Sequence, residues 1–362
     1  MNKNQSFILS LTLSCFILSC NAPDPEPEPY ASGVVVLNSG NFTDNNGTLS
    51  FIQNRGLSAS MDIFKAVNTR PLTGGVQDYT EIDGKGVILV DNSTAGLDKV
   101  EIVEINTFKS LGTLAAPDIE NPRHVVQVGP NKAYISCWGA TGDFNNFYPN
   151  PGYIAVVDMA SRKVIKKITV TKGAEYMVVS GSEVIVGNEG GEKALAVVDV
   201  NTDELKSKFD LGINSRPIGL DAAGQLWVYS NKEMIQMNAQ TKAIGSRLKI
   251  NSPNDRYVGV ITFGKDRQNL FFTHFYYDAA DGYKQKGEVY SFSTRAGVIS
   301  LASPFSKRFF SGLGIDPTNG TVYAGVTPSY KQAGYVLRYD PSTTRIIDSV
   351  KVEIAPSGFY FK

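Results

Sequence analysis

Two similar stretches of sequence decide the fold, AVVDMASRKVI at Ala155–Ile165 and AVVDVNTDELK at Ala196–Lys206. Each contains an apolar run, an aspartate, a polar turn and a second extended run. VEINTFKSL at Val103–Leu111 and LRYDPSTTRII at Leu337–Ile347 follow the same plan, and SFIQNRGLS, QMNAQTKAI and YSFSTRAGVI are looser copies. Internal repetition of this kind is typical of architectures built from stacked units, and the period identifies the unit.

The period indicates a β-propeller. Seven residues that begin the turns align at intervals of 39 to 54 residues: Phe51, Glu104, Asp158, Asp199, Asn238, Ser291 and Asp340. Each repeat resolves into four short runs rich in β-branched and aromatic residues, most clearly PIGLDA, GQLWVYS, EMIQMN and AIGSRLKI in the fifth. No segment shows a convincing helical period. Four strands in every repeat predict propeller blades, which bury their faces only against each other.

The two ends of the repeat array predict how the ring closes. The first repeat begins at GVVVLNSG (33–40), which matches a second strand, so its innermost strand is missing. The last residues, GFYFK at Gly358–Lys362, match an innermost strand that has no blade of its own. We therefore expect the C-terminal strand to complete the N-terminal blade, which removes an open sheet edge. The prediction is a single all-β domain over residues 32–362, a propeller of seven blades.

The N-terminal residues predict export and a lipid anchor. The apolar run Phe7–Ser19 is shorter than the roughly 20 residues that span a bilayer, and it fits the hydrophobic region of a signal peptide, assigned to residues 1–19. The run ends in ILSC, which resembles a bacterial lipobox with Cys20 as the lipidated residue; an ordinary signal peptide cleaved nearby is the alternative. Residues 20–31, with alternating prolines and acids, predict an extended tether. The expected location is the outer membrane, with exposure at the cell surface favoured over the periplasmic side.

Composition argues against several classes of function. Lys plus Arg and Asp plus Glu both number 35, so no positive excess exists to bind the phosphates of a nucleic acid. Two histidines and the apolar setting of Cys137 leave little material for nucleophilic catalysis, and no GxSxG, HExxH or P-loop pattern occurs. We therefore expect a protein that is not an enzyme. A sparse site built on carboxylates, as in propeller lyases and hydrolases, is the alternative.

The long loops fall on one face of the predicted propeller. The links between blades and the loops between second and third strands emerge together there, and the longest of these loops are 138–152 and 275–287. Binding residues commonly lie on such loops. Aromatic rings and asparagines are concentrated in them, and they suit an amide-bearing ligand, a glycan or a protein surface. The candidates are Asn41, Phe42, Asn92, Trp138, Phe144, Phe147, Tyr148, Asn188, Tyr276, Tyr277, Tyr283 and Tyr330.

Two other interpretations apply to these loops. Any single ring can simply pin its loop to the top of a blade. The carboxylates Asp143, Asp278 and Asp281 lie in the same loops and raise the question of calcium. They lack the sequential spacing of a calcium-binding loop, so solvated loop charges are favoured and no metal site is predicted.

A recurring arginine gives a second set of candidates. The stretch NPRHV (121–125) has an arginine 19 residues after its turn residue, and arginines recur 17 to 19 residues after four other turn residues. The five are Arg70, Arg123, Arg216, Arg256 and Arg308; Glu175–Tyr176 and Ser357 take this place in the other repeats. We expect them to ring the mouth of the central channel on the long-loop face. They either lock neighbouring blades together or bind phosphate, carboxylate or amide groups of a ligand. His124 has no counterpart, which favours a structural role.

With these repeats placed, the chain resembles a known family. GVVVLNSGNF, NTRPL, and VEINTFKSLGTL followed by NPRHV resemble YVTN-type propeller repeats, in particular those of surface-exposed propeller lipoproteins from Gram-negative gut-type bacteria. The resemblance spans roughly residues 33–362 and is strongest in the first three blades. Members of that family include cobalamin-binding lipoproteins that sit over a TonB-dependent outer-membrane transporter and pass it vitamin B12.

The resemblance implies capture of a nutrient ligand, best guessed as cobalamin or a related corrinoid, and transfer to a TonB-dependent transporter. Ser39 stands where the family usually has an acidic residue in the opening LNEGN, which bears on the identity of the ligand. A glycan-binding or adhesion propeller is the alternative function, and a propeller lyase or hydrolase is a weaker one.

Overall fold

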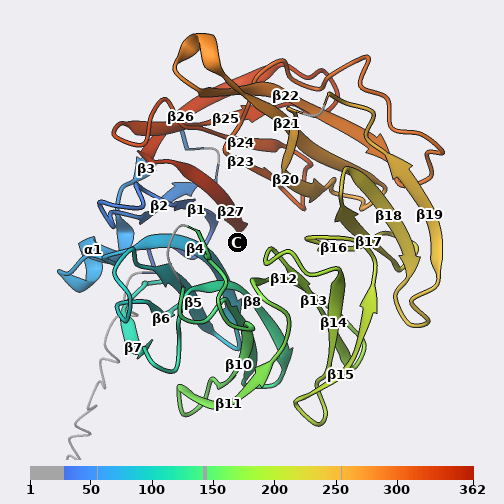
Figure 1. Ribbon diagram of the computed structural model, residues 1–362. Helices are drawn as coiled ribbons and strands as arrows, with labels where there is room; N and C mark the ends of the chain where they lie inside the picture. Colours follow the sequence, from blue (N-terminus) through green and yellow to red (C-terminus); the bar gives the residue numbers. More distant parts are fainter. Residues whose placement is uncertain (1–27, 55, 142–144, 254) are drawn as a thin grey trace, which may run out of the picture.

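The chain forms a seven-bladed β-propeller, as the repeats predicted. The structure is a computed structural model that describes residues 28–54, 56–141, 145–253 and 255–362. Seven antiparallel sheets are arranged around a central axis, and the innermost strand of each faces that axis (Figure 1). The innermost strands are β27, β4, β8, β12, β16, β20 and β23.

The first four blades have four strands each, in order from the axis outwards. Blade one contains β27 (Pro356–Phe361), β1 (Gly33–Asn38), β2 (Thr48–Gln53) and β3 (Ala59–Ser60); blade two contains β4 (Gly75–Ile82), β5 (Lys85–Asp91), β6 (Lys99–Glu104) and β7 (Ser110–Ala115). Blade three contains β8 (Pro122–Gly129), β9 (Lys132–Cys137), β10 (Tyr153–Asp158) and β11 (Lys163–Thr169); blade four contains β12 (Ala174–Ser180), β13 (Glu183–Asn188), β14 (Ala194–Asp199) and β15 (Glu204–Asp210).

The remaining three blades complete the ring. Blade five contains β16 (Arg216–Leu220), β17 (Gln225–Ser230), β18 (Glu233–Asn238) and β19 (Ile244–Lys249). Blade six contains β20 (Tyr257–Phe263), β21 (Asn269–Asp278) and β22 (Lys284–Ser293). Blade seven contains β23 (Gly312–Ile315), β24 (Val322–Val326), β25 (Ala333–Tyr339) and β26 (Ile346–Ile354).

The repeated turn residue has a structural reason. In four repeats its side-chain oxygen accepts hydrogen bonds from the backbone N–H groups two and three residues later, which closes the turn between the third and fourth strands. Asp158, Asp199, Asn238 and Asp340 all make this pair of bonds. Asp and Asn favour such turns because their short side chains imitate a backbone carbonyl. The sequence repeat is therefore a repeat of turn chemistry.

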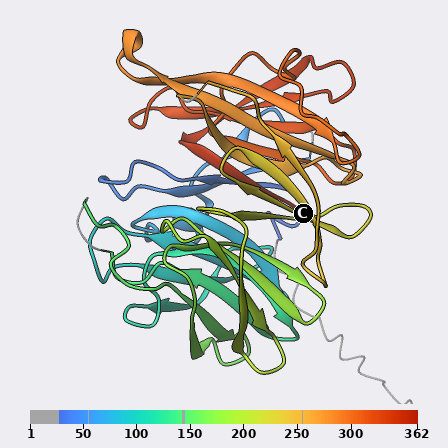
Figure 2. The same ribbon diagram turned by 45° about the vertical axis from the view of Figure 1, so that its right-hand side comes forward.

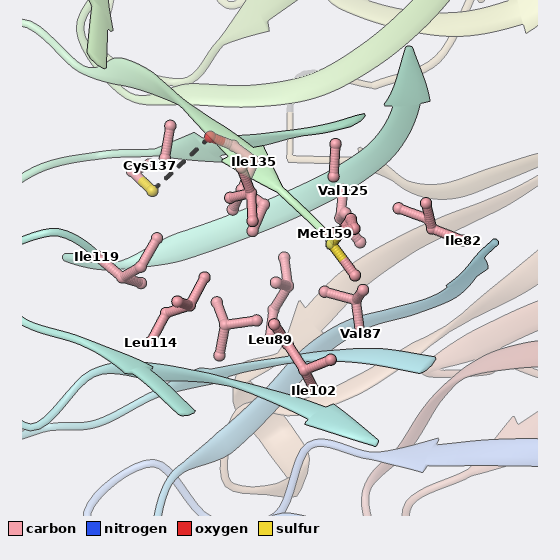
Figure 3. Close-up of a cluster of buried hydrophobic side chains, with 14 of the residues drawn as sticks. Ile82, Val87, Leu89, Ile102, Leu114, Ile119, Val125, Ile135, Cys137 and Met159 are labelled. Carbon is pink, nitrogen blue, oxygen red and sulfur yellow. Dashed lines mark hydrogen bonds between the residues drawn. The ribbon is translucent and has the colours of Figure 1, made fainter. Parts of the chain in front are cut away.

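Apolar side chains fill every gap between neighbouring blades. Figure 3 shows the cluster between blades two and three, where Val87 and Leu89 of β5 face Val125 of β8 and Ile135 of β9. Six further clusters occupy the six other gaps around the ring. Strands such as β1 and β5 are buried along nearly their whole length because a blade covers each face, and they read as continuous apolar runs.

The C-terminal strand closes the ring as predicted. β27 pairs antiparallel with β1, with Leu37 opposite Gly358 and Val34 opposite Phe361, so the two ends of the chain share blade one (Figure 1). The rings of Phe359 and Phe361 lie 5.8 and 5.1 Å from the ring of Tyr323 in blade seven. The closing strand therefore carries part of the interface between the last and first blades.

Blades one and six depart from the predicted plan. A short helix, α1 (Ile63–Asn68), follows the two-residue strand β3, although no helix was expected. In the described residues blade six has three strands rather than four, and residues 294–311 run where the fourth was predicted. Ile299 in that segment is nevertheless buried in the core, so the packing is kept without the strand pairing.

The second and third strands of blade six form the longest hairpin. β21 and β22 have ten residues each, and a 3-10 turn, η1 (Ala279–Asp281), lies at the tip. Figure 2 shows this tip standing clear of the rest of the ring. The hairpin rises from the face that carries the long loops.

The N-terminal end of the described chain docks on the opposite face. The Tyr30 ring packs edge-on against Phe51 at 5.3 Å and Phe108 at 5.6 Å, and its backbone N–H donates to the carbonyl of Asn106. Asn106 lies in the turn between β6 and β7. The predicted signal peptide and Cys20 lie outside the described residues. Within the described residues, no helix has the length and apolar character needed to cross a membrane.

Removal of residues 356–362 should destabilise the whole ring. The truncated chain loses the strand that pairs with β1 and the two rings that pack on Tyr323, so we expect the free energy of unfolding to fall by about 4 kcal/mol or more. Urea denaturation of the truncated and intact chains measures this. A peptide of the deleted sequence added in trans should restore part of the loss, and unchanged stability on truncation would contradict the closure.

Candidate ligand-binding cavity in the central channel

The central channel widens into a cavity of about 720 Å³. Its walls come from the first halves of the innermost strands, for example Gln77 of β4, Glu175 of β12 and Ser357 of β27. These halves begin at the links between blades. The cavity therefore lies at the long-loop end of the channel, and Ser39 and Tyr330 of two long loops also line it.

The wall of the cavity is divided by chemistry. Charged and polar side chains from blades two to five form one side: Gln77, Asp78, Arg123, His124, Glu175, Tyr176 and Arg216. Apolar side chains predominate on the other side, from blades five to seven and blade one: Ile218, Ile261, Phe275, Phe309, Phe310, Leu313 and Phe359. Thr273, Gln285, Ser311 and Ser357 add a few polar groups there. A concave site with an apolar wall and a few placed polar groups is typical of a site for a small organic ligand.

Arg123 connects three blades at the polar wall. From β8 its guanidinium donates to the carboxylate of Asp91 at 2.6 Å and lies 3.7 Å from that of Glu175. It also stacks on the Trp138 ring, with 3.3 Å between the guanidinium carbon and the ring centroid. The indole N–H of Trp138 in turn donates to Glu175 at 2.6 Å. Only 11% of the Arg123 side chain is exposed, so these contacts hold a largely dehydrated charge.

Arg216 connects blades five and six. Its guanidinium donates to the backbone carbonyls of Val258 and Gly259 in β20, and it lies over the ring of Tyr229 at 4.5 Å. Glu189 lies 3.7 Å away. These contacts show that Arg216 locks neighbouring blades, which was one of the two roles expected for the arginines.

Asp78 and His124 form a second polar link. The Nδ1 atom of His124 accepts a hydrogen bond from the backbone N–H of Met177, and Nε2 lies 3.8 Å from the carboxylate of Asp78. Asp78 also accepts from the backbone N–H groups of Tyr79 and Val125. Burial raises the pKa of Asp78, while the nearby imidazole opposes that shift. His124 is thus held by its neighbours and also lines the cavity.

The expected ring of five arginines is only partly formed. Arg123 and Arg216 line the central cavity, with Tyr176 between them in the chain. Arg70 instead pairs with Glu101 in β6, and Arg256 pairs with Glu288 in β22. Arg308 lines a neighbouring cavity between blades six and seven. For Arg70 and Arg308 the offset fails because helix α1 and the segment 294–311 insert extra residues before the innermost strand. Arg256 directly precedes β20, and it is its pairing with Glu288 that draws it to β22 rather than into the central cavity.

The aromatic loop candidates divide into packed and open groups. Trp138, Phe147 and Tyr148 pack edge-on against each other with centroids 5.0 to 5.7 Å apart, so they pin the loop between β9 and β10. Tyr330 lines the central cavity, and Tyr276 lines the neighbouring one. About half of the surface of three rings is exposed: Phe42 at 49%, Tyr277 at 50% and Tyr330 at 48%.

The asparagine candidates are engaged in loop structure. The side-chain oxygen of Asn41 accepts from the backbone N–H groups of Thr43 and Asp44, and that of Asn92 accepts from Thr94. The amide of the fully buried Asn188 donates to the carbonyl of Ala194. These three side chains shape the loops rather than line either cavity. Asp143 and Phe144 lie outside the described residues.

Several cavity residues were not among the sequence candidates. Asp78, Phe275, Phe309, Phe310 and Phe359 line the cavity but lie on strands or on a link. Consecutive residues near the start of the innermost strands line the cavity, so placing β4 and β27 could have selected Asp78 and Phe359. Phe309 and Phe310 carried no such signal, because they follow an irregular segment.

Burial lowers the reactivity of two side chains, the Cys137 thiol and the His274 imidazole. Burial raises the pKa of the Cys137 thiol to about 12, which makes it a poor nucleophile. Burial also lowers the pKa of His274 to about 4. Asp278 and Asp281, considered for calcium, both form ion pairs with Lys286. Across the described ranges, no three His, Cys, Asp or Glu side chains gather in a group that could hold a metal ion.

Comparison with known proteins supports the fold. No protein-family model matches the chain, and no curated protein matches it either. A quinoprotein alcohol dehydrogenase-like protein from Bacteroides thetaiotaomicron is similar with a TM-score of 0.65 and 14% identity, over 92% of this chain and 78% of that one. Hydrazine synthase from Kuenenia stuttgartiensis has a TM-score of 0.55 and 15% identity, over 76% and 85%. A functionally unknown protein from Desulfotomaculum acetoxidans has a TM-score of 0.58 and 12% identity, over 91% and 99%. At these identities the likeness concerns the fold alone.

Replacement of Arg123 by alanine should destabilise the fold. It leaves the carboxylate of Asp91, which is only 5% exposed, without its cation, so we expect a loss of about 3 kcal/mol in the free energy of unfolding. Urea denaturation measures the loss. Arg308→Ala is the matched control and should change stability by less than about 0.5 kcal/mol. Equal stability of the Arg123 variant and the natural chain would show that the ion pair does not lock the blades.

Stability should also depend on the protonation of Glu189. Burial raises the pKa of this carboxyl to about 7, above the value in the unfolded chain. The folded state therefore holds the proton to higher pH, and this contribution to stability is lost as pH rises through about 7. Glu189→Gln cannot ionise. We expect it to match the natural chain near about pH 4.5 and to be more stable by about 1–2 kcal/mol near about pH 7.5. Denaturation at both pH values measures the difference, and a constant difference would contradict the shift.

Proposed function

We propose that this chain is a ligand-capture propeller that binds an organic nutrient molecule at its long-loop face and releases it unchanged. The observation that carries the proposal is the cavity of about 720 Å³, polar on one side and aromatic on the other. Cavities of roughly 300–1,000 Å³ are usual for organic ligands. The apolar wall accommodates the body of a ligand, and the polar wall orients its hydrogen-bonding groups.

The side chains of the polar wall are held in place by their neighbours, which favours binding of a ligand over its chemical turnover. Arg123 and Arg216 are fixed by carboxylates and carbonyls, and His124 is fixed by Met177 and Asp78. Side chains fixed in this way present a rigid surface, which lowers the entropic cost of binding. A propeller lyase or hydrolase that uses Asp78 or Glu175 is the enzymatic alternative, and consumption of the ligand would distinguish it.

Cobalamin or a related corrinoid is the proposed nutrient, with a TonB-dependent outer-membrane transporter as the partner that receives it. Support comes from the resemblance over residues 33–362 to surface propeller lipoproteins, and from the lipobox-like ILSC that ends at Cys20. A ligand larger than the cavity would cover its mouth and contact the half-exposed rings of Phe42, Tyr277 and Tyr330. In this proposal the chain is anchored to the outer membrane by lipid at Cys20 and faces the exterior.

A glycan or protein surface is the second candidate ligand. Tyr257, Tyr277 and Tyr283 are 51%, 50% and 70% exposed beside or on the β21–β22 hairpin. Exposed tyrosines present large rigid contact surfaces at low entropic cost. Binding of polysaccharide without any small ligand would favour an adhesion role.

Calorimetric titration of the purified chain with cyanocobalamin tests the nutrient directly. We expect tight binding with one ligand per chain, and recovery of the ligand unchanged. If no heat of binding is measured at micromolar protein, cobalamin is excluded as the ligand. Native mass spectrometry after exposure to a mixture of corrinoids, haem and siderophores then tests capture of other nutrients, and absence of any bound molecule would contradict capture itself.

A variant that fills the cavity locates the site. Ser357→Trp places a large ring in the channel, so we expect affinity for the captured ligand to fall by about tenfold or more, or roughly 1.4 kcal/mol. Ser342→Trp adds the same ring in the exposed turn between β25 and β26 and serves as the control. Equal affinity in both variants, with unchanged thermal melting, would place the ligand elsewhere.

A further inference from the structure

A second cavity of about 400 Å³ lies beside the first, between blades six and seven. It is formed by the tip-side half of the β21–β22 hairpin, the link that leads to blade seven and the end of β24 with the residues after it. Gln285 and Phe309 line both cavities, so the two are contiguous on the long-loop face. The second cavity is therefore directly accessible from the central one.

Two cations are held at this second cavity by a fixed backbone. Ser306 forms a β-bridge with Val289, and on the other side the ring of Phe309 packs on Phe275 with centroids 5.0 Å apart. Phe310 is 1% exposed in the core. Lys307 and Arg308 lie between these anchors. The segment reaches this face because it is the link between blades six and seven, and such links emerge on the long-loop face.

The charges of the second cavity are unbalanced. Lys286, Lys307 and Arg308 line it, and Glu288 is its one acidic residue among those that the structure describes. Glu288 is already paired with Arg256 at 2.8 Å, and Lys286 with Asp278 at 2.7 Å. Within the described part of the chain, Lys307 and Arg308 have no acidic partner. Unpaired cations in a concave site attract anions, and charge-assisted hydrogen bonds then hold them.

The rest of the second cavity adds groups that an organic anion can contact. Tyr276, Phe309, Val326 and Pro328 line it beside the two exposed cations. Thr327 adds a hydroxyl donor at the same wall.

We infer that the second cavity is an anion subsite, in which Lys307 and Arg308 bind the carboxylate or phosphate group of the ligand whose body occupies the central cavity. The ligand class is thus an organic acid or a phosphate ester with an aromatic or otherwise apolar body. This inference rests on the proposed function, because it requires a ligand in the central cavity. Beyond the proposed function, the subsite specifies that the ligand is negatively charged and that this charge is bound in the second cavity.

Three probes with one aromatic body test the subsite by calorimetry: 1-naphthyl phosphate, 1-naphthoate and the uncharged 1-naphthalenemethanol. We expect both anions to bind the full chain about three- to tenfold more tightly than the alcohol. In Lys307→Gln/Arg308→Gln the anions should bind only as tightly as the alcohol, whose own affinity should be unchanged. Both residues are exposed and without an acidic partner in the described structure, so thermal melting should also be unchanged.

The matched control removes the same charges elsewhere. Lys249→Gln/Arg295→Gln replaces an exposed lysine and an exposed arginine that line neither cavity, and it should keep the preference for anions. Equal affinity of all three probes for the natural chain would overturn the subsite, as would a preference that survives Lys307→Gln/Arg308→Gln. Failure of all three probes to bind, the alcohol included, would contradict the central cavity as a ligand site and the subsite with it.

Discussion

Burial of apolar side chains between neighbouring blades is the interaction on which the rest of the structure depends. Seven apolar clusters occupy the seven gaps of the ring, and each is built partly from one blade and partly from the next. A single blade cannot bury strands such as β5, because both of its faces are apolar. The sheets must therefore form a closed ring, and β27 supplies the strand that closes it. Closure leaves a channel on the axis, and the cavity is the wide end of that channel.

The fold could be predicted from the sequence because its determinants are local and repeated. Asp158, Asp199 and Asp340 each close a turn through hydrogen bonds within four residues, so the pattern survives without knowledge of the distant contacts. The unmatched strands at the two ends then indicated closure. Prediction was wrong where the chain keeps its core contacts but abandons the repeat: helix α1 in blade one, and the segment 294–311 in blade six.

The candidate site was less predictable because its geometry depends on contacts between blades. Arg123 and Arg216 line the cavity, whereas Arg70 and Arg256 pair with carboxylates away from it. Whether a loop ring is open or packed depends on its neighbours, and Trp138 contacts Arg123 and Glu175, which are distant in sequence. Phe309 and Phe310 carry no repeat signal at all. Local sequence patterns were therefore enough to predict the scaffold and part of the polar wall of the cavity. The residues of the apolar wall could be identified only from the assembled ring.

The docking of Tyr30 shows on which face of the propeller the N-terminal end of the described chain lies. Its backbone bonds to Asn106 in a turn between third and fourth strands, on the face opposite the cavity. The chain therefore joins the propeller at one pole, and the cavity opens at the other. Under the proposed function, a partner that takes up the ligand would approach the pole away from Tyr30, because the mouth of the cavity lies there.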